Sequence, residues 1–156
     1  MPVYWFALTQ LVNINWFRAI LVFIILHVLV YPASNGYNSY MDRDETPIGG
    51  LKNPLQPTKQ LFYTTIVMDV IAVTISFFIS WYFAAGIVLY IMASRAYSYR
   101  GIRLKQCPYI GYLTVILFQG AVTYWLVYHG SSEALYTSAS TSGMIASSLL
   151  IGGFYP

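Results

Sequence analysis

Long apolar stretches constrain this chain more than any other feature of its sequence. A helix that crosses a bilayer needs about 20 mostly apolar residues, and the sequence offers five such stretches, separated by polar segments or short turns. They cover residues 16–34, 61–80, 82–99, 109–129 and 135–155. Only 8% of the residues are charged, whereas an ordinary soluble domain has about 25%. We therefore expect an all-α, polytopic transmembrane helix bundle with about five full spans.

Both ends of the sequence look incomplete for such a bundle. The first fifteen residues are apolar but shorter than a span, and they lack the basic start and the cleavage site of a signal peptide. The last residues are apolar and no polar tail follows them. We expect residues 1–156 to form a single transmembrane domain that begins with a partial helix and is truncated at both ends. Residues 61–99 are predicted to form a helical hairpin that turns near Ser80 to Gly86.

Basic residues are concentrated in two segments, 35–60 and 95–108, which follow the first and third expected spans. Counting spans places both segments on one side of the membrane, and they hold seven of the eight Lys and Arg residues. Arg18 alone lies on the other side. Because an excess of Lys and Arg marks cytoplasmic loops, we expect an integral membrane protein, in the inner membrane if the source is bacterial, with both segments cytoplasmic.

The first of these segments also holds an acidic cluster. Asp42, Asp44 and Glu45 are three of the five acidic residues of the chain, and they follow Asn38 within one or two helical turns. One interpretation is that these charges only solvate a loop beside the membrane. The other is a site for a hard cation, because carboxylate and amide oxygens are the ligands that Mg²⁺ prefers, and the metal would bridge to a phosphate. In a membrane protein that phosphate would belong to a lipid-like molecule.

The second segment is basic and rich in tyrosine. It contains Arg95, Arg100, Arg103 and Lys105, with Tyr97 between the first two. Taken alone, this pattern favours contact with anionic lipid headgroups. Opposite a carboxylate–Mg²⁺ cluster on the same membrane face, the basic side chains would complete a clamp suited to diphosphate.

Isolated polar residues in the apolar stretches are further candidates. Asp69 lies near the middle of 61–80, where an ionisable group is costly, so we expect it either to face a cavity or to bond to a neighbouring helix. Gln119 is a weaker candidate for the same cavity. His27 is predicted to be a packed or interfacial histidine rather than a base. Cys107 is the only cysteine, which rules out an internal disulfide.

These motifs resemble those of the UbiA superfamily of intramembrane prenyltransferases. The first motif of that family reads approximately Asn-Asp-x-x-Asp-x-x-x-Asp, and the segment from Asn38 to Thr46 is similar, with Asn38 and Asp42 in place. Ser39 and Thr46 stand where the family usually has Asp. The segment 97–105 resembles the Tyr-Ser-x-x-x-x-Arg/Lys-Leu-Lys loop of the chlorophyll-synthase and menaquinone-type branch, and it is the more specific match.

The resemblance covers nearly the whole chain and implies a fold and a function. Family members have about nine helices, and this chain is similar to helices two to six, the N-terminal half. It implies transfer of an isoprenyl group from a prenyl diphosphate to a hydrophobic, usually aromatic, acceptor. The implied site has Mg²⁺ held by Asn38, Asp42, Asp44 and Glu45, diphosphate held by Arg95, Arg100, Arg103 and Lys105, and catalytic roles for Asp42, Tyr97 and Lys105.

Two other functions stay open at this point. The family carries a second Asp-rich motif after the sixth helix, and this sequence contains only the first. A non-catalytic lipid- or quinone-binding membrane protein, or an inactive fragment, is therefore an alternative to an enzyme. A fragment of a transporter or channel, with Asp69 in its pathway, is a third reading. In each case we expect membrane lipid and no nucleic acid as a partner.

Overall fold

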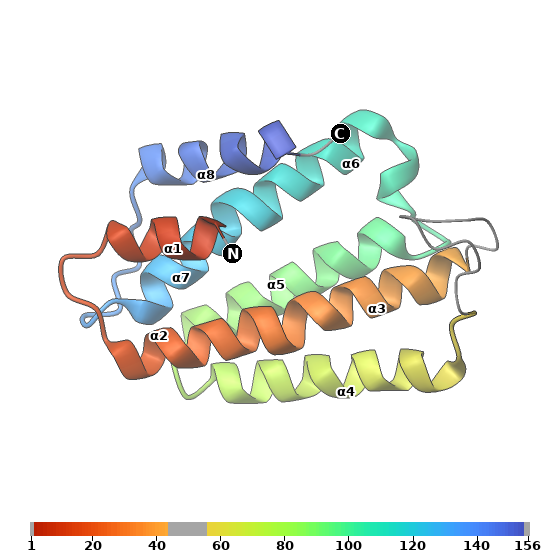
Figure 1. Ribbon diagram of the computed structural model, residues 1–156, viewed down its shortest axis with the longest axis horizontal. Helices are drawn as coiled ribbons and strands as arrows, with labels where there is room; N and C mark the ends of the chain where they lie inside the picture. The colour runs from red at the N-terminus through yellow and green to blue at the C-terminus, as the bar shows by residue number, and fades with distance from the viewer. Residues whose placement is uncertain (1, 44–55, 155–156) are drawn as a thin grey trace.

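The computed structural model describes residues 2–43 and 56–154, which form a bundle of helices (Figure 1). The elements in chain order are α1 Pro2–Thr9, α2 Trp16–Phe23, η1 Ile24–Val30, α3 Tyr31–Asp42, α4 Lys59–Ser76, α5 Trp81–Ser98, η2 Leu104–Gln106, α6 Pro108–Val115, η3 Ile116–Val122, α7 Thr123–Ser131 and α8 Thr141–Phe154. Within the described residues there is no strand, only an isolated bridge between Ile14 and Ser132. The all-α prediction is confirmed.

Two continuous helices are long and apolar enough to cross a membrane. They are Trp16–Asp42, of 27 residues, and Pro108–Ser131, of 24 residues. The expected spans 61–80 and 82–99 correspond to α4 and α5, of 18 residues each, and the expected span 135–155 to α8, of only 14 residues. Large apolar side chains face outward around the bundle, among them Phe78 at 81% and Leu149 at 71% exposure. Such a periphery fits a lipid environment better than water.

The helices run side by side around a small core. In Figure 1, α3 lies between α4 and α5, while α1 and α8 lie beside the helix formed by α6 and α7. The contacts agree, since α4 packs on both α3 and α5, α1 packs on α7, and α8 packs on η3. Fully buried Ile25, Leu26, Phe83 and Leu126 bring α5, α7 and η1 together.

The hairpin between α4 and α5 turns at residues 77–80, so the predicted turn is right at Ser80 and wrong at Gly86. Ser80 begins α5, because its Oγ accepts a hydrogen bond of 3.0 Å from the N–H of Phe83. Gly86 lies inside α5, where a Cβ atom would lie 2.8 Å from the Leu126 side chain. This glycine therefore serves close packing of α5 against α7 rather than a turn.

Both long helices contain a π-helical segment, η1 in the first and η3 in the second. Pro32 follows η1 in the first turn of α3 and has no N–H to donate, so the chain ahead of it adopts the wider winding without ending the helix. In the second helix the Thr123 hydroxyl donates to the Phe118 carbonyl, at 2.9 Å. Because the π-helical segment η1 accommodates Pro32, the first helix continues through Asp42, eight residues beyond the end predicted at residue 34.

Candidate functional site

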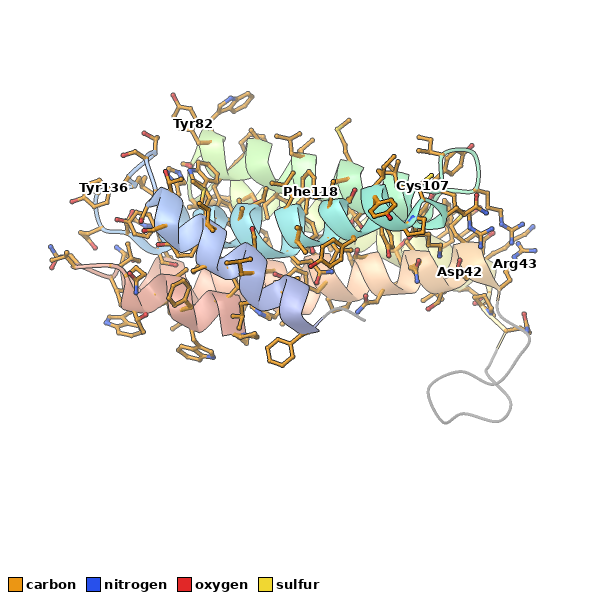
Figure 2. The ribbon with its side chains drawn as sticks, turned by 90° about the horizontal axis from the view of Figure 1, so that it is seen from above. Asp42, Arg43, Tyr82, Cys107, Phe118 and Tyr136 are labelled. Atoms are coloured by element: carbon orange, nitrogen blue, oxygen red, sulfur yellow. The ribbon has the colours of Figure 1, made fainter. Side chains whose placement is uncertain are left out.

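The two charged segments of the sequence meet at one end of the bundle. Figure 2 shows Asp42, Arg43 and Cys107 at this end and Tyr82 and Tyr136 at the opposite end, with Phe118 between them. The first segment reaches this end on the last turn of α3, and the second reaches it between α5 and α6. Within the described residues, the two segments therefore lie at the same end of the bundle.

The last turn of α3 aligns the two oxygen-bearing side chains of the first motif. Asn38 and Asp42 are four residues apart, so they lie on the same face of the helix, one turn from each other. The helix ends directly afterwards, because Arg43 adopts a left-handed conformation with φ 49° and its N–H bonds to the Ser39 carbonyl. Asp44 and Glu45 lie outside the described residues.

The second segment inserts Lys105 between these side chains. The Lys105 ammonium donates to Asn38 Oδ1 at 2.9 Å and to both carboxylate oxygens of Asp42. The Ser98 hydroxyl, from the end of α5, donates to the same Asn38 Oδ1 at 2.7 Å. Asn38 Oδ1 therefore accepts two hydrogen bonds and joins α3, α5 and the turn that follows them.

A tight turn gives Lys105 its position. Arg103 is left-handed, with φ 46°, and the short helix η2 follows it. A Cβ atom on Gly111 would lie 3.1 Å from the Lys105 Cα atom, so the glycine lets α6 begin directly against this turn. Arg103 also reaches back to Asp42, with 3.3 Å between Nη2 and Oδ1. Two cations thus share one carboxylate.

This cluster, formed by Asn38, Asp42, Ser98, Arg103 and Lys105, is partly withdrawn from solvent. The Asp42 side chain is 13% exposed and that of Lys105 is 17% exposed. With one carboxylate and two cations, the cluster carries a net positive charge. Partial burial strengthens the electrostatic interaction of this charge with an anion, because the local dielectric constant is below that of water. An anion that enters the cluster would therefore be stabilised.

The cluster also contains two side chains whose oxygen atoms could bind a metal ion, Asn38 and Asp42. The Asp42 carboxylate and the Asn38 amide oxygen converge on one point, which the Lys105 ammonium occupies as a cation. Mg²⁺ typically takes one or two carboxylates from the protein and completes its shell with water and phosphate oxygens. Among residues 2–43 and 56–154 there is no group of three or more Asp, Glu, His or Cys side chains. In the part of the chain that the structure describes, the oxygen ligands that the cluster could offer to a metal are therefore those of Asn38 and Asp42.

The remaining basic residues of the second segment lie in two different places. Arg100 donates from Nε to the Met41 carbonyl, at 2.9 Å, and so stays beside the cluster. Arg95 instead pairs with Asp69 of α4, with 3.1 Å between Nε and Oδ2. Its guanidinium lies 3.9 Å above the centre of the Tyr37 ring. The structure therefore shows Asp69 bonded to a neighbouring helix, the second of the two roles expected for it.

One cavity begins beside the cluster, and a second cavity adjoins the first further along the bundle. The first, of about 120 Å³, is lined by Asn38, Ser98 and Tyr97 at one end and by Gln119 at the other. The second, of about 230 Å³, extends between α1, η1 and η3 and is lined by His27 and Gln119. The two cavities share Ser34, Asn35, Tyr90 and Gln119 in their walls.

Several residues that line these cavities were not predicted as site residues, among them Asn35, Tyr90 and Ser98. His27 was predicted to be a packed or interfacial histidine, and it lines the larger cavity. Asn35 carried a usable signal, because it precedes Asn38 by three residues and thus lies on the same helix face. His27 and Tyr90 carried none, since their proximity depends on how η1 and α5 pack.

No family model matches the sequence, and no curated protein or solved structure is significantly similar to it. The family resemblance therefore depends on the two motifs and their spacing.

Proposed function

We propose that this chain forms the diphosphate-binding half of a UbiA-like, Mg²⁺-dependent prenyltransferase. The single observation that supports this most strongly is the contact between Lys105 and the pair Asn38–Asp42. The two motifs were identified separately in the sequence. Asn38 and Asp42 match the first motif of the family and Lys105 matches the second, and these three residues contact one another.

In this proposal the chain spans the membrane about five times, through the two long helices and through α4, α5 and α8. The cluster then lies at the cytoplasmic face, because it is the end that gathers the Lys and Arg residues. The cavities lead from that face into the hydrocarbon region. A prenyl diphosphate would enter with its charged group at the cluster and its chain in the bundle.

The basic residues would hold the diphosphate. Lys105 leaves the Asn38–Asp42 pair and binds a phosphate oxygen, while Arg103 and Arg100 neutralise the remaining negative charge. Mg²⁺, held by Asn38 and Asp42 together with Asp44 or Glu45, would add positive charge at the leaving oxygens. Arg95 contributes indirectly, because its pairing with Asp69 orients the helix that carries Tyr97 and Ser98.

The chemistry that follows is loss of diphosphate from the allylic carbon. The C–O bond breaks, the electron pair leaves with the diphosphate, and an allylic cation remains in the cavity. Tyr90, Tyr97 and Phe118 line the cavity beside the cluster, and their ring faces stabilise a cation. An aromatic carbon of the acceptor then forms the new bond and loses its proton.

Binding of a prenyl diphosphate is the first test of this function. The probe is a non-hydrolysable thiolo analogue, added to the purified chain in detergent with Mg²⁺. We expect Asp42→Asn and Lys105→Ala each to weaken binding at least about tenfold, since each removes a charge-assisted contact. Lys59→Ala is the matched control, because Lys59 lies exposed at the same end of the bundle, at the start of α4. Equal affinity of all four proteins would overturn the assignment.

Formation of prenylated product separates the enzyme from its alternatives. Mg²⁺-dependent transfer that Asp42→Asn abolishes would support the prenyltransferase. Saturable binding without transfer would indicate the non-catalytic lipid-binding protein, an alternative favoured by the neutralisation of Asp42 by Lys105 and Arg103. Solute flux into liposomes that Asp69→Asn abolishes would indicate the transporter.

A further inference from the structure

A serine and a histidine are hydrogen-bonded to each other at the end of the bundle opposite the charged cluster. Ser80 begins α5 and His129 lies in the last turn of α7, with 2.7 Å between Oγ and Nε2. The Nδ1 atom of His129 lies 2.9 Å from the Tyr136 carbonyl, which can only accept, so Nδ1 carries the proton. Nε2 is therefore the acceptor, and the Ser80 hydroxyl donates to it. A nucleophile, a general base and a group that orients the base are arranged in this way.

The surroundings of His129 suit the uptake of a proton. The side chain is 1% exposed, and burial favours the neutral imidazole, which is the form that can act as a base. The positive charge of Arg18, whose guanidinium bonds to the nearby Ser132 carbonyl, acts in the same direction. The imidazole ring is stacked on that of Trp125, with 5.1 Å between the centres. Once the imidazole has taken a proton from Ser80, the face of the indole stabilises the cation.

The start of α5 supplies donors for the negative charge that an attack by Ser80 would produce. The Oγ atom of Ser80 already accepts a hydrogen bond of 3.0 Å from the Phe83 N–H. The N–H groups of Trp81 and Tyr82 belong to the same first turn, and they have no acceptor among the described residues. N–H groups at a helix start stabilise an adjacent anion. They can therefore stabilise the oxygen of a carbonyl group to which the serine has added.

An apolar groove runs along the bundle to this pair. It has a volume of about 410 Å³ and lies between α5 and the second long helix, and none of its described lining residues is charged. Tyr82 and Trp125 line one end, and the rings of both contact His129, with 6.2 Å and 5.1 Å between the centres. Leu89 and Leu117 line the groove about two helical turns further along. Such a groove accommodates a hydrocarbon chain, because it offers a polar group no partner.

The pair also lies at the depth where a bilayer places its ester groups. Figure 2 shows Tyr82 and Tyr136 at the end opposite the charged cluster. Exposed aromatic side chains gather at this end, among them Phe78, Trp81 and Tyr82. Trp and Tyr are enriched where the headgroups of a bilayer meet its hydrocarbon region. An ester group at this level would reach Ser80, which is half-buried, while its acyl chain lies in the groove.

We propose that Ser80 and His129 form a site, separate from the charged cluster, that cleaves acyl esters of membrane lipids. The Ser80 Oγ forms a bond to the ester carbonyl carbon while its proton passes to His129 Nε2. The C–O bond of the ester then breaks, and the alcohol leaves with the proton from His129. Water hydrolyses the acyl-serine, which releases the carboxylic acid and restores Ser80. None of these steps uses Mg²⁺ or a prenyl diphosphate, so the proposal is independent of the prenyltransferase.

A fluorophosphonate with a long alkyl chain tests Ser80 as a nucleophile, because it modifies serines that a base activates. The purified chain in detergent micelles is treated with this probe, and mass spectrometry locates the modified residues. We expect Ser80 to react at least about a hundredfold faster than Ser140, the gain that a general base supplies. Ser140 is the matched comparison, because it is exposed and caps α8 through the Gly143 N–H, but bonds to Ser142 instead of a histidine. Equal reactivity of the two serines, or an unmodified Ser80, would overturn the proposal.

His129→Gln tests the base. A carboxamide can hydrogen-bond to a hydroxyl but cannot take its proton, so we expect Ser80 modification to slow at least about a hundredfold and Ser140 modification to keep its rate. An unchanged rate at Ser80 would exclude His129 as the base. The comparison of Ser80 with Ser140 in the unmodified chain needs no substitution, so it decides the question even where His129→Gln lowers stability.

The groove is tested by the length of the acyl chain. We measure kcat/KM for p-nitrophenyl octanoate and for p-nitrophenyl acetate and compare their ratio between variants, since partition into micelles is the same for each protein. Ala85→Trp fills the groove and should lower the ratio at least about tenfold, because the longer chain loses apolar contact. Val88→Trp is the control, because Val88 is exposed on the same helix outside the groove. Equal ratios in the two variants would show that the groove does not bind the acyl chain.

Discussion

Lys105 donates hydrogen bonds to both carboxylate oxygens of Asp42, 63 residues earlier in the chain. The contact joins the last turn of α3 to the turn between α5 and α6. It also determines the charge state of the cluster, because Arg103 approaches the same carboxylate and leaves one positive charge in excess. Removing the Asp42 carboxylate should therefore leave Lys105 without its anionic partner, so that its ammonium can bind an added anion.

The first prediction follows from this exchange. In Asp42→Asn, we expect inorganic pyrophosphate without Mg²⁺ to bind more tightly than in the unmodified chain, by about three- to tenfold, because Lys105 and Arg103 have lost their competing anion. The Mg²⁺-dependent part of binding should disappear in the same variant. Calorimetric titration with and without Mg²⁺ measures both effects. A uniform loss of affinity under both conditions would show that Asp42 acts only by supporting the fold.

The second prediction concerns the ion pair between Arg95 and Asp69. Both side chains are largely buried, with 18% and 12% exposure, so removing one partner leaves an uncompensated charge. We expect Asp69→Leu to destabilise the chain by about 3 kcal/mol and the double variant Arg95→Leu, Asp69→Leu by clearly less. Thermal unfolding in detergent gives both values. If the double variant is destabilised by the sum of the values for Asp69→Leu and Arg95→Leu measured separately, the pair is not coupled.

The same variants locate Arg95 relative to the diphosphate. If Arg95 acts through the orientation of α5, the double variant should bind the thiolo analogue within about threefold of the unmodified chain. A loss as large as that of Lys105→Ala would place Arg95 in direct contact with the diphosphate.

The third prediction concerns the packing of α8 on η3. A Cβ atom on Gly120 would lie 2.5 Å from the Ser148 Cα atom, which is backbone and cannot rotate away. Gly120→Ala should therefore force α8 outward and destabilise the chain by about 1–3 kcal/mol. Gly153→Ala is the control, because nothing lies within 4 Å of the added atom. It should leave the unfolding midpoint unchanged or raise it slightly, since alanine favours a helix. Equal midpoints for both variants would refute this packing.

The fourth prediction concerns the end of the bundle opposite the cluster. Ser80 begins α5 and also bonds to His129 of α7, with 2.7 Å between Oγ and Nε2. His129 in turn contacts the Tyr136 carbonyl through Nδ1, at 2.9 Å. We expect Ser80→Ala to destabilise the chain by about 1–2 kcal/mol, since it removes a helix cap and strands a buried imidazole nitrogen.

The control for this prediction is Ser142→Ala, which removes one hydrogen bond from an exposed serine. It should change the unfolding midpoint by less than half as much as Ser80→Ala. A similar small change in both variants would mean that the contact between Ser80 and His129 contributes nothing to stability.

The sequence by itself determined the class of structure and much of the candidate site. The length of the apolar stretches and the scarcity of charge can be read directly from the sequence. These two features predicted the helices, and counting the expected spans predicted that both charged segments lie on one side. Residue spacing within a helix is equally local, and it put Asn38 and Asp42 on one face. The extension of the first helix through Pro32 to Asp42 could not be predicted, because the wider winding of η1 depends on its neighbours.

Only the tertiary structure decided which charges pair. Arg95 and Lys105 look alike in the sequence, yet one pairs with Asp69 and the other with Asp42. Which carboxylate each cation meets depends on the rotation of α5 against α4 and on the left-handed turn at Arg103. Neither can be predicted from the residue types of one segment. The cavity between His27, Asn35 and Gln119 has the same origin. It is lined by residues of helices that are separate in the sequence, among them α1, η1 and η3, and its volume depends on how these helices pack.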